Sequence, residues 1–250
     1  MKKGLIFVLF ALVSIVSYSQ ISWNVKAGMT MNNMTKLDDT KMKLGYTFGV
    51  GADYALNDMW SVQSGLNITA KGYKFDLTEE VNGKMITIAE GKKNPIYLEL
   101  PILAAVKFNI ADNMKLVVNA GPYLAFGLGG KASLDAVGDY KKQLESYDEP
   151  TSVDYKLFKK YTADSDEAEY MADVWKEGDD SNTKRSEMKR FDLGLQYGVG
   201  LEFGHYLINL SGQYGFLKTI DTYKYNEKTD KEEKLSPKNM NFAITVGYKF

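Results

Sequence analysis

Long segments in which apolar residues alternate with small or polar ones constrain the fold more than any other feature. The last of these segments runs from Asn241 to Phe250. Its apolar positions are Phe242, Ile244, Val246, Tyr248 and Phe250, and the residues between them are Ala243, Thr245, Gly247 and Lys249. Successive side chains of a strand point to opposite faces, so a period of two predicts a strand with one apolar face.

Eight segments of this kind can be placed along the chain. They are predicted at 21–33, 44–55, 59–75, 95–109, 114–129, 189–203, 206–217 and 240–250. Each roughly matches or exceeds the 9–11 residues that a tilted membrane-spanning strand needs. Short connections at 56–58, 110–113 and 204–205 alternate with long ones at 34–43, 76–94, 130–188 and 218–239. Short periplasmic turns and long outer loops are typical of outer-membrane barrels, with both ends of the chain on the periplasmic side.

Two fold classes share this pattern, a secreted soluble barrel and a closed barrel in a membrane. Aromatic residues favour the membrane, because they gather at the ends of the predicted strands, as amphipathic rings do at lipid–water interfaces. The short-turn end carries Trp23, Tyr54, Trp60, Phe108, Phe203, Tyr206, Tyr248 and Phe250, and the other end carries Tyr46, Phe126, Phe191, Tyr214, Phe216 and Phe242. We therefore predict an all-β protein, an eight-stranded antiparallel up-and-down transmembrane β-barrel in outer-membrane lipid.

The first nineteen residues have the composition of a signal peptide. Lys2 and Lys3 precede an apolar run from Leu5 to Val16, and Ser17 and Ser19 place small side chains before a cleavage site. We expect residues 1–19 to be removed on export and residues 20–250 to form the barrel domain. No later stretch reaches 18 consecutive apolar residues, so no membrane-spanning helix is expected.

Charge and cysteine content exclude several classes of protein. The net charge of −1 gives no global field for nucleic acid, which is not an expected partner. The chain has no cysteines, which excludes disulfides, thiolate metal sites and a cysteine nucleophile. The chain's one histidine, His205, lies in a predicted periplasmic turn, far from the outer leaflet where a lipid-modifying Ser–His–acid set would act. We predict no enzyme, no cofactor and no metal site.

The predicted inward face carries charges of both signs. The cations are Lys26, Lys71, Lys107, Lys115 and Lys249, and the acids are Asp53, Glu99, Asp192 and Glu202. An eight-stranded barrel is just wide enough for side chains to fill, and an unpaired buried charge is costly. We expect these groups to pair as a structural plug; the alternative is a path for protons or small ions. Pro101 and Pro122 fall opposite each other on neighbouring strands, and each lacks an N–H, which predicts a local break in the ladder.

The longest connection, taken as an extracellular loop at about 130–188, is strongly charged. Between Lys131 and Glu187 it holds fifteen acidic and nine basic residues. Ala168, Met171, Ala172 and Trp175 recur at helical spacing behind Asp164, Asp166 and Glu167, which predicts a short amphipathic helix. Asp164, Asp166, Asp179 and Asp180 offer oxygen ligands but lack the spacing of a calcium loop. The loop is either a solvated cap or a surface for an envelope or secretion partner.

Three short motifs resemble one known family. The segment Tyr97-Leu98-Glu99-Leu100-Pro101, the later Gly121-Pro122-Tyr123 and the ending Val246-Gly247-Tyr248-Lys249-Phe250 are similar to those of the PorT-like, porin-family outer-membrane barrels of Gram-negative bacteria. The resemblance implies the fold and the outer-membrane location. It also implies that Tyr248 and Phe250 act as the signal read by the barrel assembly machinery.

These observations leave three hypotheses for function. The first is a non-enzymatic barrel that serves as a structural, envelope or export-assembly component and presents its loops outward. The second is a porin-like channel for small solutes or ions. The third is a lipid-modifying enzyme, which the position of His205 disfavours.

Overall fold

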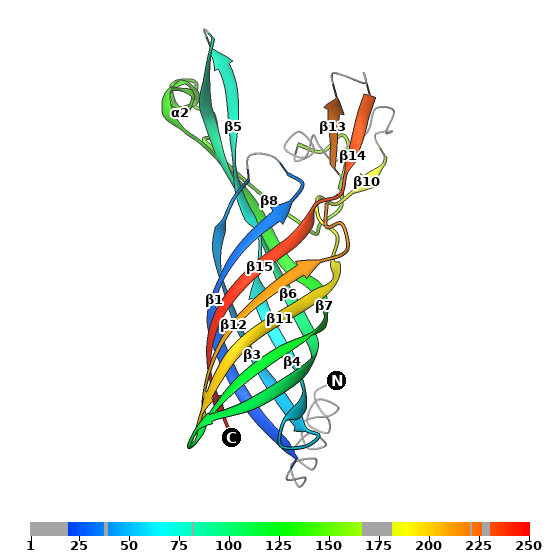
Figure 1. Cartoon of the computed structure of the whole chain (residues 1–250). Helices are drawn as coiled ribbons and strands as arrows, with labels where there is room; N and C mark the ends of the chain where they lie inside the picture. Colours follow the sequence, from blue (N-terminus) through cyan, green and yellow to red (C-terminus); the bar gives the residue numbers. More distant parts are fainter. Residues whose placement is uncertain (1–19, 38–39, 82, 167–181, 221, 227–230) are drawn as a thin grey trace, which may run out of the picture.

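The structure, a computed structural model, contains a closed ring of eight antiparallel strands (Figure 1). It describes the chain apart from residues 1–19, 38–39, 82, 167–181, 221 and 227–230, and only the backbone of 222–226 and 231–234. The ring consists of β1 (Ile21–Thr35), β3 (Lys43–Ala55), β4 (Trp60–Ala70), β6 (Lys84–Ala111), β7 (Met114–Ala136), β11 (Phe191–Phe203), β12 (Tyr206–Gly215) and β15 (Lys238–Lys249). The predicted fold class is confirmed. The predicted signal peptide, residues 1–19, lies outside the described residues.

The first and last strands close the ring. β15 pairs with β1 in a register that places Val25 opposite Tyr248, and the N–H of Phe250 donates to the carbonyl oxygen of Trp23 at 2.9 Å. The other partner of β15 is β12. A closed ring leaves no strand edge in the bilayer, where water is not present to satisfy backbone groups.

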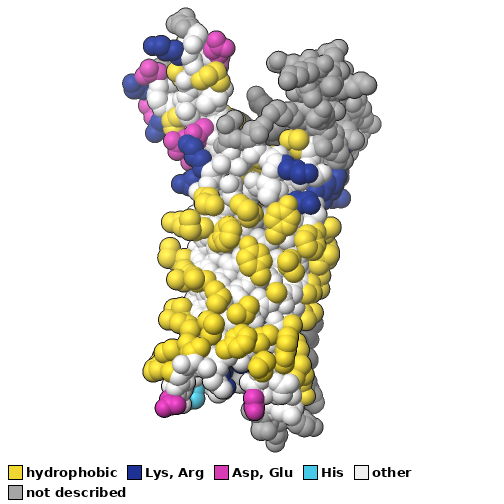
Figure 2. All heavy atoms as spheres, viewed as in Figure 1, with side chains coloured by type: hydrophobic (Ala, Val, Ile, Leu, Met, Phe, Trp, Pro, Cys, Tyr) yellow, Lys and Arg dark blue, Asp and Glu magenta, His cyan; other side chains and the backbone are white. Residues whose placement is uncertain are grey.

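The two faces of the ring are inverted relative to a soluble protein. Large apolar side chains point outward and are exposed, among them Met29, Phe48, Leu66, Leu210 and Val246. Figure 2 shows hydrophobic side chains, here called the apolar belt, spread over the height of the barrel wall on the face in view. Side chains that point inward are polar and buried, such as Asn32, Asp53 and Glu202. An apolar exterior around a polar interior is stable in lipid and unstable in water.

Three strands extend the wall above the ring, on the side of the long connections. β5 (Tyr73–Val81) forms a hairpin with the upper part of β6, β2 (Thr40–Lys41) pairs with β5, and β8 (Ser152–Lys156) pairs with the upper part of β7. The helix α2 (Gly138–Ser146) lies beside this sheet (Figure 1). The remaining strands form two small pairs, β9 (Tyr161–Thr162) with β10 (Lys184–Arg185) and β13 (Thr222–Asn226) with β14 (Lys231–Leu235).

Two boundaries predicted from the sequence are wrong. The predicted strand 59–75 ends at Ala70, and the predicted loop 76–94 is the β5–β6 hairpin. The reason is that this hairpin is exposed on both faces over much of its length, so its sequence does not alternate between apolar and polar residues. Its turn does carry a local signal, since Asn82-Gly83 is a favoured hairpin dipeptide and Gly83 has a φ of +75°.

The predicted loop at 130–188 is only partly a loop. β7 continues to Ala136, and α2, β8, β9 and β10 follow it. The helix predicted over Ala168, Met171, Ala172 and Trp175 lies outside the described residues, as do Glu167, Asp179 and Asp180. Within the described part of the chain, no helix is long and apolar enough to cross a membrane.

The predicted break at Pro101 is present as a gap in the ladder. The pairing of β6 with β7 is interrupted between Pro101↔Tyr123 and Ala104↔Ala120 without a change of register, and the pairing with β4 is interrupted between Ser64↔Ile102 and Asn67↔Glu99. The hydroxyl of Ser64 donates to the carbonyl oxygen of Pro101 at 2.8 Å. Ser64 thus satisfies an acceptor at the gap.

Closure of the ring depends on Gly28, which leads to a first prediction. A Cβ atom at this position would lie 2.0 Å from the carbonyl oxygen of Ile244 on β15. We expect Gly28→Val to reduce the fraction of folded barrel, measured as the difference in gel migration between boiled and unboiled samples. The matched control, Ala27→Val, adds its methyl groups to the exposed lipid-facing side and keeps the shift. Equal shifts for both variants would contradict the role of Gly28.

Candidate functional site

The barrel lumen holds most of the charged residues predicted to face inward, in two clusters. The lower cluster lies near the short turns. Lys107 Nζ is 2.7 Å from Asp53 Oδ2 and 3.1 Å from Glu202 Oε1, and Lys249 Nζ is 2.9 Å from Glu202 Oε2. The amide of Gln63 donates to Asp53 at 2.8 Å. Two cations and two acids therefore form a neutral group held by strands from around the ring.

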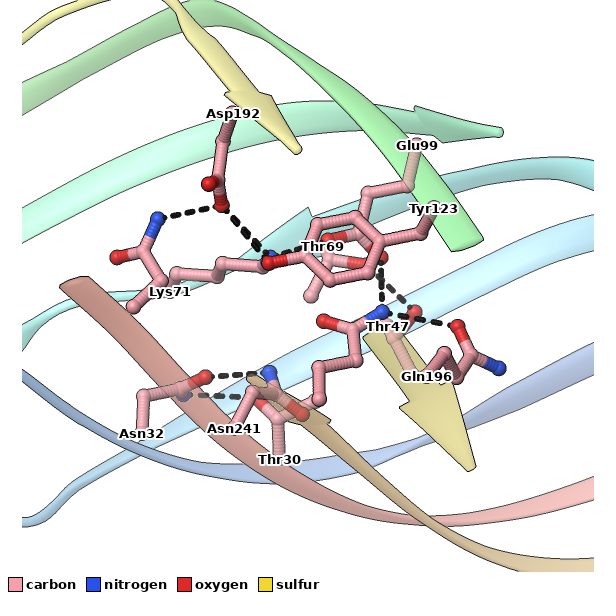
Figure 3. A network of polar contacts seen from close by, with 12 residues as sticks. Thr30, Asn32, Thr47, Thr69, Lys71, Glu99, Tyr123, Asp192, Gln196 and Asn241 are labelled. Carbon is pink, nitrogen blue, oxygen red and sulfur yellow. Dashed lines mark hydrogen bonds and ion pairs between the residues drawn. The ribbon is translucent and has the colours of Figure 1, made fainter. Parts of the chain in front are cut away.

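The upper cluster is centred on Lys71 (Figure 3). Lys71 Nζ lies 2.6 Å from Glu99 Oε1 and 3.7 Å from Asp192 Oδ2, and all three side chains are almost fully buried. Tyr123 donates its hydroxyl to Asp192 at 3.0 Å, and Asn239 donates its amide to the same oxygen at 2.8 Å. The ammonium group also lies 4.6 Å from the centre of the Tyr123 ring. Hydrogen bonds and a cation–π contact thus offset part of the cost of burying these charges.

A bend in the chain brings Lys71 into the lumen. β4 ends at Ala70, and Gly72 adopts a φ of +124° before β5 begins. A Cβ atom at Gly72 would lie 1.9 Å from the carbonyl oxygen of Lys93, so only glycine fits. The N–H of Lys71 donates to the carbonyl oxygen of Pro95 at 2.9 Å, which fixes the bend against β6.

Uncharged side chains connect the acids of the upper cluster to the opposite wall. Glu99 Oε2 accepts hydrogen bonds from Thr69 at 2.9 Å and from Gln213 at 3.2 Å. Gln213 in turn donates to Gln196 at 3.0 Å. On the neighbouring strands, Asn241 donates to Asn32 at 2.6 Å (Figure 3). The bond between Gln213 and Glu99 crosses the lumen from β12 to β6, and the other three join neighbouring strands.

Two of the predicted lumen cations do not join either cluster. Among the residues that the structure describes, Lys26 and Lys115 have no ion-pair partner. The expectation that all nine charged groups pair is wrong for these two. Lys26 lines both a cavity of about 90 Å³ around the lower cluster and a smaller one of about 30 Å³ below Glu99. Because polar side chains contribute to the lining of both cavities and both are large enough for water, hydration can replace an ionic partner for Lys26.

An apolar cap closes the lumen above the upper cluster. Leu157 and Phe158, which follow β8, are buried together with Met188 and Tyr97. The ring of Phe158 meets that of Tyr97 edge-on at 5.8 Å, and it occupies space that a Cβ atom at Gly127 would fill. This segment falls within the predicted loop 130–188, and the cap was not predicted. Its signal is weak, since Leu157-Phe158 is a single apolar pair within a charged stretch.

Arg190 and Glu187 hold the cap in place. Arg190 donates to the carbonyl oxygens of Gly127 at 2.8 Å and Phe158 at 3.4 Å, and its guanidinium group lies 5.2 Å from the centre of the Phe158 ring. Glu187 forms a buried ion pair with Lys93. Burial, together with the charge of Glu187, raises the pKa of Tyr155 on β8, so its phenol stays protonated and bonds to that carboxylate.

The predicted rim residues lie where the aromatic pattern placed them. Tyr54, Trp60, Phe203 and Tyr206 are exposed at the short-turn end, and Trp23 is partly buried beside them. Tyr248 stacks on His205 with ring centres 5.4 Å apart and meets the rings of Tyr206 and Phe250 edge-on. His205 also bonds through Nδ1 to the carbonyl oxygen of Lys249 at 2.8 Å. The histidine thus packs in a rim cluster, at the opposite end of the barrel from the cap.

The described residues offer little for metal chemistry. No group of three or more His, Asp or Glu side chains within them could hold a metal ion. Asp164 and Asp166 belong to the described residues and form no such group.

The closed ring, the apolar belt and the filled polar lumen define a small transmembrane β-barrel. The chain belongs to the family described as outer membrane protein beta-barrel domain, whose model matches residues 17–221. It is therefore an outer-membrane protein that lies in the lipid bilayer, as predicted. None of the curated proteins matches its sequence.

Solved structures of bacterial surface barrels are similar to this chain. Ail of Yersinia pestis shares 16% sequence identity over 92% of this chain and 98% of its own, with a TM-score of 0.36. OprG from Pseudomonas aeruginosa shares 14% identity over 92% of this chain and 95% of its own, with a TM-score of 0.40. Neisserial surface protein A shares 11% identity over 93% and 98%, with a TM-score of 0.39.

A second prediction concerns the upper cluster. Lys71→Met leaves Glu99 and Asp192 buried without their cation, so we expect the free energy of unfolding to fall by about 3–5 kcal/mol. Urea titration of the barrel in detergent measures this loss. Adding Glu99→Gln and Asp192→Asn to Lys71→Met removes the unpaired charges and should restore part of it.

The matched control for this prediction is Lys92→Met. Lys92 pairs with Asp135 at 3.2 Å, but both side chains are nearly half exposed, so the loss should be less than about 1 kcal/mol. Equal losses for Lys71→Met and Lys92→Met would mean that the buried cluster does not stabilise the barrel.

Proposed function

We propose that this barrel is a non-conducting, non-enzymatic scaffold of the outer membrane that presents a rigid sheet to an envelope or export partner. The observation that carries the proposal is the combination of a lumen blocked at three levels with a wall that continues outward as ordered strands. A conducting pore needs a continuous aqueous path, and a presenting scaffold needs a rigid support outside the bilayer.

The three levels of the block differ in chemistry. The lower cluster is a neutral group of ion pairs, the upper cluster is an almost fully buried ionic network, and the cap is apolar. An ion that passed Lys71 would then have to cross Leu157, Phe158 and Met188 without hydration. The three levels are made of different side chains, so the loss of one would leave the other two in place, which favours a permanent plug over a gate.

The extension above the ring is suited to presentation. β6 and β7 run without interruption from the lipid-embedded wall into the outer sheet, where β5 and β8 pair with them. The hairpin carries exposed apolar side chains near its tip, among them Val81, Met85 and Ile86. Exposed apolar groups on a rigid protrusion are typical of sites that bind other proteins. α2 and β8, which belong to the segment 131–187 that we propose as a partner surface, lie on the same extension.

The similarity of Tyr97–Pro101 and of the last strand to PorT-like barrels supports an export or envelope-assembly role within this proposal. The same ending supports recognition of Tyr248 and Phe250 by the barrel assembly machinery. The absence of an enzymatic role rests on His205, whose ring lies in the short-turn rim cluster. A lipid-modifying triad at the outer leaflet would need a histidine at the other end of the barrel.

The alternative function is a channel for small solutes. The observation that favours it is the cavity of about 90 Å³ next to the lower cluster, which Lys26 lines. In this alternative the cap moves aside and Arg190 loses its bonds to Gly127 and Phe158.

Conductance separates the two functions. In planar bilayers we expect the unmodified barrel to give no current steps above the leak of the bilayer, because the cap and the upper cluster both block the lumen. A triple variant, Lys107→Ala, Lys71→Ala and Phe158→Ala, removes one side chain from each of the three levels and should give measurable ion flux. Current steps from the unmodified protein would establish the channel and overturn the scaffold.

Presentation can be tested with single cysteines, since the chain has none of its own. A membrane-impermeant maleimide should label Met85→Cys on intact cells, because Met85 is 65% exposed in the outer hairpin. The control, Asp112→Cys, lies in a short turn and should be labelled only after lysis. A photo-crosslinker attached to the same cysteines should capture a discrete partner from position 85 and not from position 112. Labelling of both positions on intact cells would contradict the orientation, and identical crosslinks would contradict the partner surface.

A further inference from the structure

Lysine is the first charged residue that several strands present on the outer face above the apolar belt. On β7 Lys131 follows the exposed Leu128. On β6 Ile96, Asn94 and Lys92 share the outer face, and Lys92 is the furthest of the three from the belt. Lys238 begins β15 and lies 5.7 Å from the ring of Tyr214, which belongs to the belt. We call the set the lysine collar; it comprises Lys41, Lys74, Lys92, Lys131, Lys156 and Lys238. Figure 2 shows dark blue side chains directly above the yellow belt.

The register of the strands places lysines of the collar opposite one another. Lys41 is paired with Lys74, Lys74 with Lys92, and Lys131 with Lys156. Lys43 lies close enough to Lys74 and Lys92 for their charges to act on it. Like charges directly opposite each other on neighbouring strands are destabilising. This arrangement therefore costs stability unless anions lie against the collar.

The acids of the chain satisfy the collar only from the side away from the membrane. Lys92 pairs with Asp135 at 3.2 Å and Lys131 with Asp154 at 3.7 Å, and Lys41 pairs with Asp76. Each acid follows further out along its strand, and the pairs are largely exposed, so solvent screens them. The membrane side of the collar has no such acids among the described residues, because the belt begins there.

The opposite rim of the barrel lacks a collar. Its three short turns, 56–59, 110–113 and 204–205, contain Asp58 and Asp112 but no lysine or arginine. Both rims carry aromatic residues, so contact with a lipid–water interface alone does not require the lysines. The collar thus matches a property of the outer leaflet rather than of membranes in general.

We propose that the lysine collar binds the phosphate groups of lipid headgroups in the outer leaflet. An ammonium group is a compact charge that pairs with phosphate, and a lysine stem can lie along apolar surface while its head reaches the headgroup layer. The collar is continuous with the lipid-facing belt, so one lipid molecule can contact both, with its chains on the belt and its phosphate on the collar. Free phosphate would gain only the second contact. This inference goes beyond the scaffold function and does not depend on a protein partner.

The test compares two triple variants of the full chain that remove equal charge. The collar variant is Lys74→Gln, Lys92→Gln and Lys131→Gln. The matched control is Lys84→Gln, Lys141→Gln and Lys142→Gln, which lie on the outer hairpin and α2; in each set two of the three lysines have an acidic partner. Each is reconstituted in phosphatidylcholine vesicles with a trace of spin-labelled phosphatidic acid or spin-labelled phosphatidylcholine. The spectrum gives the fraction of each label held at the protein surface.

We expect the unmodified protein and the control to select phosphatidic acid over phosphatidylcholine. In the collar variant at low salt, the ratio of bound phosphatidic acid to bound phosphatidylcholine should be about tenfold lower. A third variant with arginine at positions 74, 92 and 131 should keep the selectivity, since the charge is retained. Migration of unboiled samples shows whether each variant is folded; if the glutamine variant does not fold, single substitutions at 74 and 92 serve in its place.

Three results would overturn the proposal. They are unchanged selectivity in the folded collar variant, an equal loss in the control, and a loss of selectivity when inorganic phosphate is added at matched ionic strength. The last would assign the collar to free phosphate instead of lipid.

Discussion

Closure of the backbone ladder in a solvent without hydrogen-bonding groups is the constraint on which the structure depends. Each strand of the ring needs a partner on both sides, and the last pair, β15 with β1, satisfies the remaining edge. Closure with eight strands then sets a narrow lumen. Close packing within the wall also requires glycines such as Gly28 and Gly72, because carbonyl oxygens of neighbouring strands occupy the space where their side chains would lie.

The narrow lumen decides how its charges are arranged. Side chains that point inward have little access to bulk solvent, so most of the ions meet ions or amides across the ring. The lower cluster achieves neutrality locally, with Lys107 and Lys249 against Asp53 and Glu202. The upper cluster has two acids for Lys71, and the tyrosine and asparagine donors around Asp192 share the additional negative charge. Removing one member of such a cluster leaves an unpaired buried charge, which strongly destabilises the barrel. The intact cluster itself adds little net stability, because its attraction is offset by the cost of burying the charges.

The ring was predictable from the sequence because lipid imposes a period of two on every strand that crosses it. The same reasoning identified inward-facing Lys71, Glu99 and Asp192, since parity alone assigns a side chain to a face. It failed where both faces meet water, as at the adjacent exposed residues Thr78 and Glu79 in the β5–β6 hairpin, and where the chain folds back, as at Leu157 and Phe158. The ion-pair partners within the lumen could not be predicted from the sequence either. They depend on the strand register, which keeps Lys26 apart from the clusters and is set by the shear of the whole barrel.

The outer part of the molecule is an extension of the ring rather than a separate structure. β6 and β7 pass from lipid into water as continuous strands, and their pairing beyond one register shift, between Ile96 and Tyr97, sets the register of the sheet above the membrane. That register aligns Lys74 with Lys92 outside the barrel and, on the inner side of the same strands, directs Lys93 toward Glu187 of the cap. The same two strands therefore fix the plug, the outer sheet and the cation row at the membrane surface. A continuous connection of this kind suits the proposed scaffold, since a partner bound to the hairpin would be linked to the barrel wall by the same two strands.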